Sequence, residues 1–128
     1  MVRLQSAAPA FVVSDVGATA RWYAETLGFT IFPFPDTEPW TFANMVRDGV
    51  EIMLLGLEGY QKPDLAPLRP GGMWDAYIRT TGVNELYASL MDQVFVTMPM
   101  TKQGYGDNEF EIRDPNGYVL VFSELLEE

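Results

Sequence analysis

The sequence predicts an α+β fold built from two copies of a βαβββ module. Three observations support this: two amphipathic helical stretches, two hairpin-turn signals, and a nearly constant offset between the two halves. The helices begin near Asp15 and Gly82, 67 residues apart, and the turns begin at Asp48 and Asp114, 66 residues apart. Two independent landmarks with nearly one period indicate a duplicated module.

The first module, about residues 7–57, begins with a strand followed by a helix. Apolar side chains recur every three or four residues after the strand, which is the spacing of one helix face. Ser14 or Asp15 supplies an N-cap, and Gly28 supplies the C-terminal stop. The expected elements are a strand over 8–14, a helix over 15–28, a strand over 29–32 that is ended by Pro33 and Pro35, and strands over 40–47 and 50–55.

The second module, about residues 73–124, repeats this order after a connecting loop. The segment 56–72 is rich in glycine and proline, so we expect residues 58–72 to form the connection. The expected elements are a strand over 73–80, a helix from 82 to 91, a strand over 94–98 that stops at Pro99, a strand over 108–113, a turn at 114–117 and a strand over 118–123. We treat residues 1–128 as a single domain.

One module cannot bury both faces of its own sheet, because its helix covers only one of them. We expect the second face to meet the other module, so that the two half-sheets form a curved, partly open, barrel-like cavity of ligand size. The modules can pair within one chain or between two chains, and the sequence leaves both arrangements open.

Composition excludes several classes of function. The chain has no cysteine and no histidine, which removes disulfides, thiolate catalysis and Ser-His-Asp chemistry. Its formal net charge of −10 repels nucleic acid and anionic lipid and attracts cations. It has neither an apolar run of membrane-spanning length nor a signal-peptide pattern, so we expect a cytoplasmic protein.

Two motifs resemble those of a known family. The segment Val13-Ser14-Asp15-Val16 leads through Trp22-Tyr23 to Leu27-Gly28-Phe29, and Gly104-Tyr105-Gly106 precedes Phe110-Glu111-Ile112-Arg113-Asp114-Pro115-Asn116-Gly117. In this order, over nearly the whole chain, they resemble the vicinal oxygen chelate superfamily of glyoxalases, extradiol dioxygenases, and fosfomycin- and bleomycin-resistance proteins. The resemblance is specific for the fold and leaves the activity open.

The resemblance also implies four positions at which metal-dependent members carry ligands. In this chain these positions hold Ala8, Met53, Asp75 and Val121. Asp75 alone offers a ligand for a hard cation, whereas a catalytic metal usually needs three protein ligands. We therefore expect no metal and no cofactor.

Candidate ligand-binding residues are aromatic, sulfur-containing or acidic side chains on the strands and loops expected to line the cavity. Asp75 can hold a cationic group or act as a base, or it lies at a solvated strand end. The aromatic residues line the cavity or simply fill the core. Glu109 and Glu111 share one face of their strand, and we expect it to be solvated, although the sequence does not fix which face meets the cavity. The candidates are Trp40, Phe42, Met53, Trp74, Asp75, Tyr77, Tyr105 and Val121.

The favoured hypothesis is a metal-independent protein that binds a small molecule and carries no catalytic residues. Bleomycin-resistance proteins, as the resemblance implies, sequester a bulky cationic antibiotic as homodimers, so we expect a cationic or aromatic ligand, such as a bleomycin-like antibiotic, and a homodimer. The alternative is a glyoxalase-like lyase or isomerase, or a dioxygenase-related enzyme, that works without the usual metal. Asp75 or a glutamate would then be the base, with Tyr77 or Tyr105 as a donor. A third alternative is a paralogue that has lost activity and serves as a partner or regulator.

Overall fold

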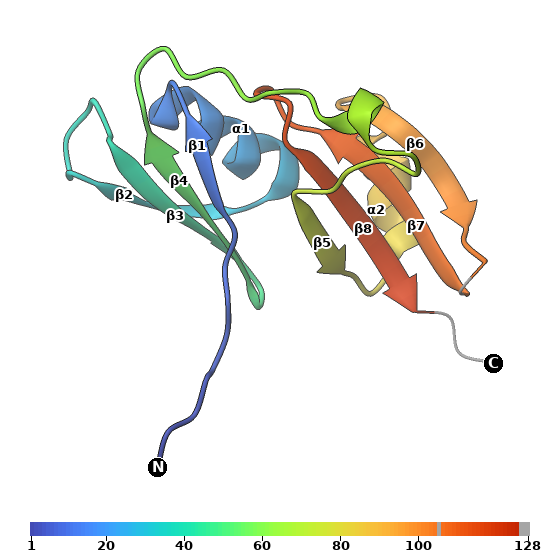
Figure 1. Cartoon of the computed structure of the whole chain (residues 1–128). Coiled ribbons are helices and arrows are strands. Elements are labelled where there is room, and N and C mark those ends of the chain that lie inside the picture. Colours follow the sequence, from blue (N-terminus) through green and yellow to red (C-terminus); the bar gives the residue numbers. More distant parts are fainter. Residues whose placement is uncertain (105, 126–128) are drawn as a thin grey trace. The chain divides into compact units, whose positions relative to one another are not determined.

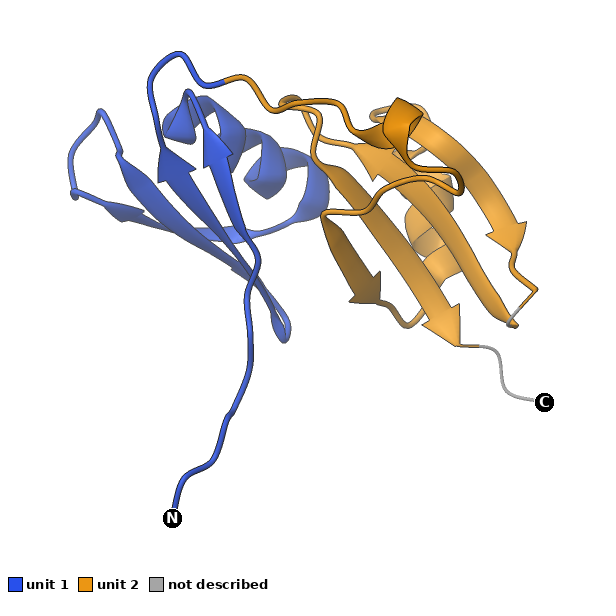
Figure 2. Ribbon diagram, viewed as in Figure 1, with its two compact units in different colours: residues 1–60 blue, residues 61–128 orange. Residues whose placement is uncertain are grey.

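The structure is a computed structural model and describes residues 1–104 and 106–125. The chain divides into two compact units, residues 1–60 and residues 61–128 (Figure 2). Each unit has one α-helix packed on an open, four-stranded mixed sheet (Figure 1), which confirms the predicted α+β fold of two βαβββ modules. Neither helix of the described chain is long and apolar enough to cross a membrane.

In the first unit, a parallel strand pair lies beside an antiparallel meander. The strand order is β1-β4-β3-β2, with β1 and β4 parallel and the other neighbours antiparallel. A parallel pair needs a crossover connection, and helix α1 begins that crossover immediately after β1. The elements are β1 (Ala10–Val13), α1 (Val16–Leu27), β2 (Thr30–Phe34), β3 (Phe42–Arg47) and β4 (Val50–Gly56).

Helix α1 has the predicted caps at both ends. The Asp15 side chain accepts a hydrogen bond from the Ala18 backbone N–H at 3.0 Å, so Asp15 is the N-cap rather than Ser14. Gly28 takes the left-handed conformation, with φ of 73°, and its N–H reaches the carbonyl of Ala24. These caps satisfy backbone groups that the helix itself leaves unpaired.

The second unit repeats this topology. Its strand order is β5-β8-β7-β6, again with one parallel pair, β5 and β8. A short 3-10 helix, η1, lies in the connection, which was expected to be a loop without regular structure. The elements are η1 (Ala66–Leu68), β5 (Ala76–Arg79), α2 (Val83–Leu90), β6 (Phe95–Lys102), β7 (Asp107–Arg113) and β8 (Val119–Leu125).

The prediction that Pro33 and Pro99 end their strands was wrong, although β2 does end before Pro35. β2 continues through Pro33 to Phe34, and β6 continues through Pro99 to Lys102. Both strands lie at a sheet edge, where a missing N–H interrupts no ladder on the outer side. In β6, register shifts on either side of Met98 also loosen the pairing with β7.

Three strands are shorter than predicted, β1, β3 and β5, and the late start of β3 and β5 moves three candidate residues off them. β3 begins at Phe42, which leaves Trp40 in the preceding loop. β5 begins at Ala76, so Trp74 and Asp75 precede the strand instead of lying on it. Asp75 still joins the sheet edge, because its backbone N–H donates to the carbonyl of Val119 at 2.9 Å.

Each helix buries one face of its own sheet and leaves the other face uncovered by that helix. In the first unit the helix-side face is apolar and at most 3 % exposed: Phe11, Val13, Ala43, Met45, Ile52 and Leu54. In the second unit the Phe110 ring stacks on Phe122 of β8, with centroids 5.3 Å apart, and meets the Tyr87 ring of α2 edge-on at 5.0 Å. We call the opposite face open face A in the first unit, where it includes Phe42 and Met53, and open face B in the second unit, where it includes Tyr77 and Val121. These two faces carry the predicted candidates that lie on strands.

The sheet registers show which positions of the two modules correspond. Met53 lies opposite Ala10 and Asn44, and Val121 lies opposite Tyr77 and Glu111. Met53 and Val121 therefore hold matching positions, as the family resemblance implied.

The similar letters before the two turns, Val46-Arg47-Asp48 and Ile112-Arg113-Asp114, predict that Arg47 matches Arg113, and this prediction was wrong by one residue. Arg47 lies on the helix side and donates to the Leu27 carbonyl at 2.8 Å, whereas Arg113 pairs with Asp64 at 3.3 Å. The register matches Met45 with Ile112, because Met45 follows the residue that faces Met53 and Ile112 follows the residue that faces Val121. A longer turn in the second unit shifts the offset, so similar letters beside the turns misled the alignment.

Candidate functional site

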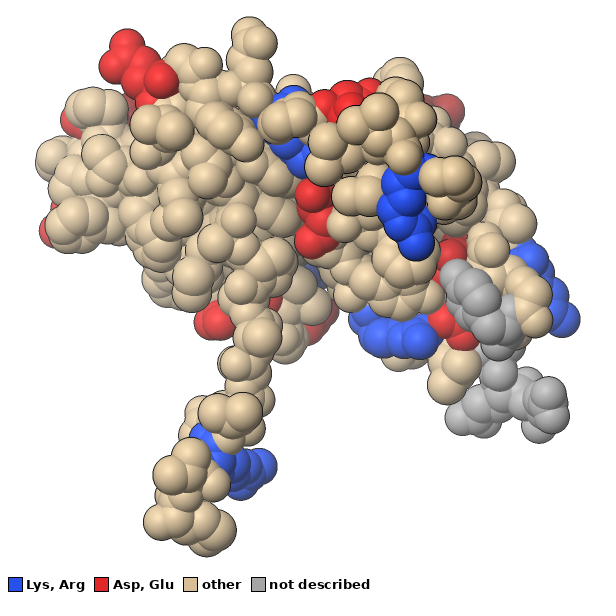
Figure 3. Space-filling view, in the orientation of Figure 1, with Lys and Arg blue, Asp and Glu red and all other residues tan. Residues whose placement is uncertain are grey.

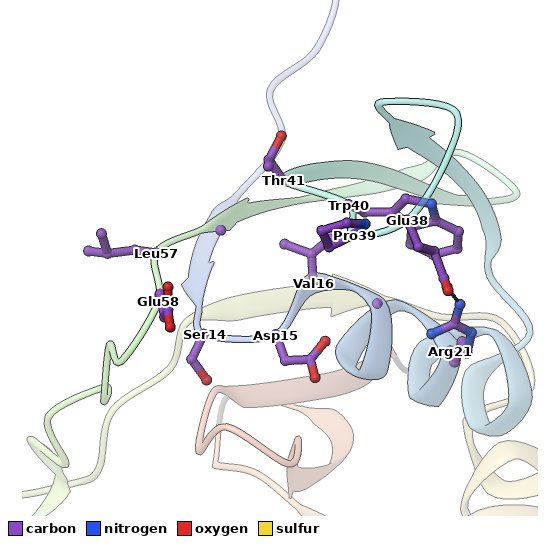
Figure 4. A pocket seen from close by; sticks show the side chains of 12 residues that line it. Ser14, Asp15, Val16, Arg21, Glu38, Pro39, Trp40, Thr41, Leu57 and Glu58 are labelled. Carbon is purple, nitrogen blue, oxygen red and sulfur yellow. Dashed lines mark ion pairs between the residues drawn. The ribbon is translucent and has the colours of Figure 1, made fainter.

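The first unit contains a pocket of about 760 Å³ (Figure 4). It lies past the carboxyl ends of the parallel strands β1 and β4, beside the N-terminus of α1, which is a common place for ligands in sheets with crossovers. Trp40 is the one sequence-predicted residue in its wall. The lining residues are Ser14, Asp15, Val16, Gly17, Arg21, Glu38, Pro39, Trp40, Thr41, Gly56, Leu57 and Glu58.

One side of this pocket is held by an ion pair stacked on Trp40. The Arg21 guanidinium forms an ion pair with Glu38 and lies 4.8 Å from the centroid of the Trp40 ring. The indole N–H of Trp40 is buried and has no hydrogen-bond partner among the described residues. Since Glu38 neutralises Arg21, the pocket keeps the negative charge of Asp15 and Glu58, which favours a cationic occupant.

Open face A brings two further predicted residues together. Phe42 and Met53 lie on this face on the neighbouring strands β3 and β4, two positions apart in register. Three large apolar side chains of the same face are exposed: Phe32 by 56 %, Phe34 by 65 % and Leu55 by 41 %. The face is therefore mainly apolar, and the surface over it is largely uncharged in Figure 3.

Open face B has a different chemistry, because charged and hydroxyl side chains replace apolar ones at matching positions. Where the first unit has Phe42 opposite Leu55, the second has Glu109 opposite Ser123. Tyr77 takes the place of Ala10. Figure 3 shows basic and acidic groups side by side over this unit.

Three predicted residues meet at the β5 edge of open face B. The rings of Trp74 and Tyr77 lie 5.0 Å apart, and Trp74 is 50 % exposed. The Asp75 carboxylate accepts a hydrogen bond from the Val119 N–H at 2.8 Å and lies 3.5 Å from the Lys62 ammonium. Val121 is buried opposite Tyr77, beneath this edge. Tyr105, the remaining candidate, lies outside the described residues.

A buried polar cluster extends from Tyr77 across β8 to β7. The Tyr77 hydroxyl lies 2.6 Å from Glu109 Oε2, 3.0 Å from Asp107 Oδ2 and 3.0 Å from the Ser123 hydroxyl. Asp107 and Glu109 are only 1 % and 2 % exposed. The expectation that Glu109 lies on a solvated strand face was therefore wrong, because Tyr77 reaches across the sheet and covers it.

One cation balances part of the charge in this cluster. Arg79 forms a hydrogen-bonded ion pair with Asp107 and lies 5.2 Å from the Tyr77 ring centroid. The hydrogen bond from Arg79 holds the pKa of Asp107 below its ordinary value, and the same contact raises the pKa of Arg79. Burial of Asp107 acts in the opposite direction but does not reverse the shift.

Sequence reasoning missed most of this cluster. Asp107, Ser123 and Arg79 belong to no motif in the sequence. A signal was nevertheless present: Asp107, Glu109 and Glu111 alternate along one strand, which places three carboxylates on one face. The sequence could not show that a tyrosine two strands away would cover two of them.

The donor set at the four family-implied positions does not fit a catalytic metal ion. Ala8 and Val121 offer no ligand atom, Met53 offers a soft thioether, and Asp75 is already engaged by Lys62 and Val119. Within residues 1–104 and 106–125, no three acidic side chains gather in a way that could hold a metal.

Comparison with known proteins places these features in a family context. Residues 5–122 match the model of the Glyoxalase/Bleomycin resistance protein/Dioxygenase superfamily. No curated protein matches the chain in sequence.

Solved structures share the fold at low identity. TioX from Micromonospora sp. ML1 superposes with a TM-score of 0.74 at 16 % identity, covering 93 % of this chain and 97 % of its own. A glyoxalase-related enzyme from Clostridium phytofermentans gives 0.75 at 14 % identity and 98 % of both chains. The bleomycin-binding protein of bleomycin-producing Streptomyces verticillus, solved with copper(II)-bleomycin, gives 0.68 at 23 % identity, covering 95 % and 97 %.

Proposed function

Since the chain belongs to the Glyoxalase/Bleomycin resistance protein/Dioxygenase superfamily, we propose that it is a metal-independent small-molecule binding protein of that superfamily. Its ligand is a cationic or aromatic compound, such as a bleomycin-like antibiotic, which it sequesters without chemical change. The bleomycin-binding protein of similar fold supports the choice of ligand class.

The observation that carries this proposal is the edge of open face B. Trp74 presents a half-exposed indole next to the Asp75 carboxylate and packs against Tyr77. A half-exposed indole beside a carboxylate suits a cationic, aromatic ligand. The net charge of −10 adds a long-range attraction for cations.

The assembly and location follow from the same proposal. We propose a homodimer in the cytoplasm that confers antibiotic resistance by holding its ligand, without contact to nucleic acid or membrane. Sedimentation equilibrium at micromolar protein measures the oligomeric state, and a monomer at all concentrations would contradict the dimer.

Titration with metal-free bleomycin, followed by calorimetry and thermal unfolding, tests the binding function. We expect saturable binding and a melting temperature that rises with ligand concentration. Trp74→Leu and Asp75→Asn should each weaken binding by about tenfold, as expected for an aromatic or charged contact at a binding centre. Phe95→Leu and Asp92→Asn remove an exposed ring and an exposed carboxyl elsewhere in the unit and serve as matched controls.

Absence of binding and of any thermal shift at millimolar concentrations of bleomycin and other cationic aromatic drugs would overturn the proposal. Equal losses of affinity in the controls and in the Trp74 and Asp75 variants would remove open face B as the site.

One observation favours a second candidate function, a lyase or isomerase without metal. The Tyr77 hydroxyl and the Glu109 carboxylate lie 2.6 Å apart, so a proton can pass between them. Such a pair could take a proton from carbon next to a carbonyl and return it elsewhere. The exchange of the α-proton of an α-hydroxyketone for deuterium in deuterated water, followed by NMR, tests this activity. Glu109→Gln should abolish the exchange. If the unaltered protein exchanges the proton no faster than buffer alone, the lyase or isomerase function is excluded.

A further inference from the structure

Lys62 is a largely buried cation in the connection between β4 and β5. Its side chain is only 13 % exposed, which is unusual because lysine normally keeps its ammonium in water. The ammonium lies 3.5 Å from Asp75 Oδ2 and 5.3 Å from the centroid of the Tyr118 ring, and it donates to the carbonyl of Pro63 at 3.2 Å. A carboxylate, an aromatic face and a carbonyl therefore surround it.

The protein positions the two main recognition groups without help from Lys62. The Val119 N–H donates to Asp75 Oδ2, and the Asp75 N–H donates to the Val119 carbonyl, so the sheet edge fixes the carboxylate. Tyr118 is 7 % exposed, and its N–H donates to the carboxylate of Asp114 in the turn before β8. The receptor belongs to the sheet and its turn, whereas the cation comes from a connecting segment.

The connecting segment is attached to this unit by few contacts of its own. Asp64 pairs with Arg113 at 3.3 Å and accepts the Ala66 N–H at 3.1 Å, which places η1 against the unit. Residues 57–75 contain no strand, so no ladder of backbone hydrogen bonds holds Lys62 in place. Its ammonium can therefore leave Asp75 without disrupting the sheet.

We propose that Asp75 and Tyr118 form a binding site for a primary ammonium group, and that Lys62 fills this site until a ligand ammonium displaces it. The identity of the displacing ligand rests on the proposed function, while the ammonium site itself does not. Trp74 and Tyr77 lie on the same edge and would contact the apolar part of an amine bound there.

The direct test replaces Lys62 with methionine, which keeps the length of the side chain and removes its charge. n-Butylammonium chloride is then compared with sodium chloride at equal ionic strength, by melting temperature and by the backbone amide shifts of Asp75 and Val119. We expect a saturable response of Lys62→Met to n-butylammonium, at about tenfold lower concentration than for the unaltered protein.

Two variants make the test specific. Lys102→Met removes the other lysine of this unit, which is exposed, and this variant should respond like the unaltered protein. The double variant Lys62→Met with Asp75→Asn should show no response beyond that to sodium chloride. Equal responses to the two salts in Lys62→Met, or equal responses of all variants, would overturn the proposal.

A measurement on the lysine itself covers the case in which Lys62→Met does not fold. In the folded protein, acetic anhydride should modify Lys62 several times more slowly than Lys102, and Asp75→Asn should raise the rate at Lys62 alone. Equal rates at both lysines would show that Lys62 does not occupy a site.

Titration with bleomycin distinguishes the ammonium site from the proposed binding of bleomycin-like ligands. If n-butylammonium binds to Lys62→Met while bleomycin binds to neither protein, the ammonium site stands and the proposed ligand is wrong. If bleomycin binds equally to both proteins and n-butylammonium has no effect, the proposed function stands and the ammonium site is wrong.

Discussion

The Tyr77 hydroxyl lies 2.6 Å from the Glu109 carboxylate and joins the edge strand β5 to β7 across the intervening strand β8. This contact covers a carboxylate that would otherwise face outward from open face B. It also gives the second unit a polar layer at positions where the first unit has Phe42 and Leu55. The two modules thus share one backbone topology and differ in the chemistry of their open faces.

Tyr77→Phe should destabilise the protein by about 1.5–3 kcal/mol, because it removes a hydrogen bond to a buried charged group. Urea unfolding followed by far-UV circular dichroism measures the change. Tyr87→Phe is the matched control, since the Tyr87 ring packs on Phe110 and would remain. A loss in Tyr77→Phe no larger than in this control would show that the contact adds no stability.

The stability of the protein should fall on acidification, and Asp107 should account for part of the fall. Its folded pKa is lowered by Arg79, so its stabilising contribution is present above the ordinary carboxyl pKa of about 3.9 and is lost as the pH falls through the lower, folded pKa. Urea unfolding between pH 2 and 7 should give a shallower acid slope for Asp107→Asn.

Asp92→Asn removes an exposed carboxyl from the same unit and controls for net charge in that comparison. Parallel acid slopes for the unaltered protein and Asp107→Asn would contradict the role given to the Arg79–Asp107 pair.

Asp15→Ala should cost about 1 kcal/mol of unfolding free energy, because the N-cap acceptor for the Ala18 N–H is lost. Asp15→Asn keeps an acceptor at the same place and should recover most of the loss. Thermal or urea unfolding of the three proteins decides the matter, and equal stability of all three would show that the cap is dispensable.

Gly28→Ala should cost about 1–2 kcal/mol, because Gly28 holds φ at 73° and an added Cβ would lie 3.4 Å from the Arg47 guanidinium. Gly49→Ala is a suitable control, since a Cβ there meets no atom within 4 Å. We expect the control to change stability by less than about 0.5 kcal/mol. Similar losses at both positions would point to a general intolerance of alanine instead.

The sequence was most informative where local rules act alone. The caps at Asp15 and Gly28 were predictable because capping depends on residues only three or four positions away. Pro33 and Pro99 were misjudged because tolerance of a proline depends on whether its strand lies at an edge, and strand order is not a local property.

The candidate site was predictable only in part for a similar reason. The family resemblance implied that Met53 and Val121 hold matching positions, and the register agrees. Trp40 was expected near Phe42, yet it lines a pocket beside α1, because the chain turns between the two residues. Asp75 was identified as an acid of interest, while the lysine that occupies it lies in a segment with no pattern to mark it.

The sequence by itself determined the duplicated βαβββ topology and the absence of histidine and cysteine chemistry, because these follow from composition, periodicity and spacing. The tertiary structure decided which charges are buried and which are paired. Tyr77 with Glu109, Arg79 with Asp107 and Lys62 with Asp75 are 32, 28 and 13 residues apart in sequence. Such contacts form only when strand order and register bring distant segments together, and no local pattern encodes them.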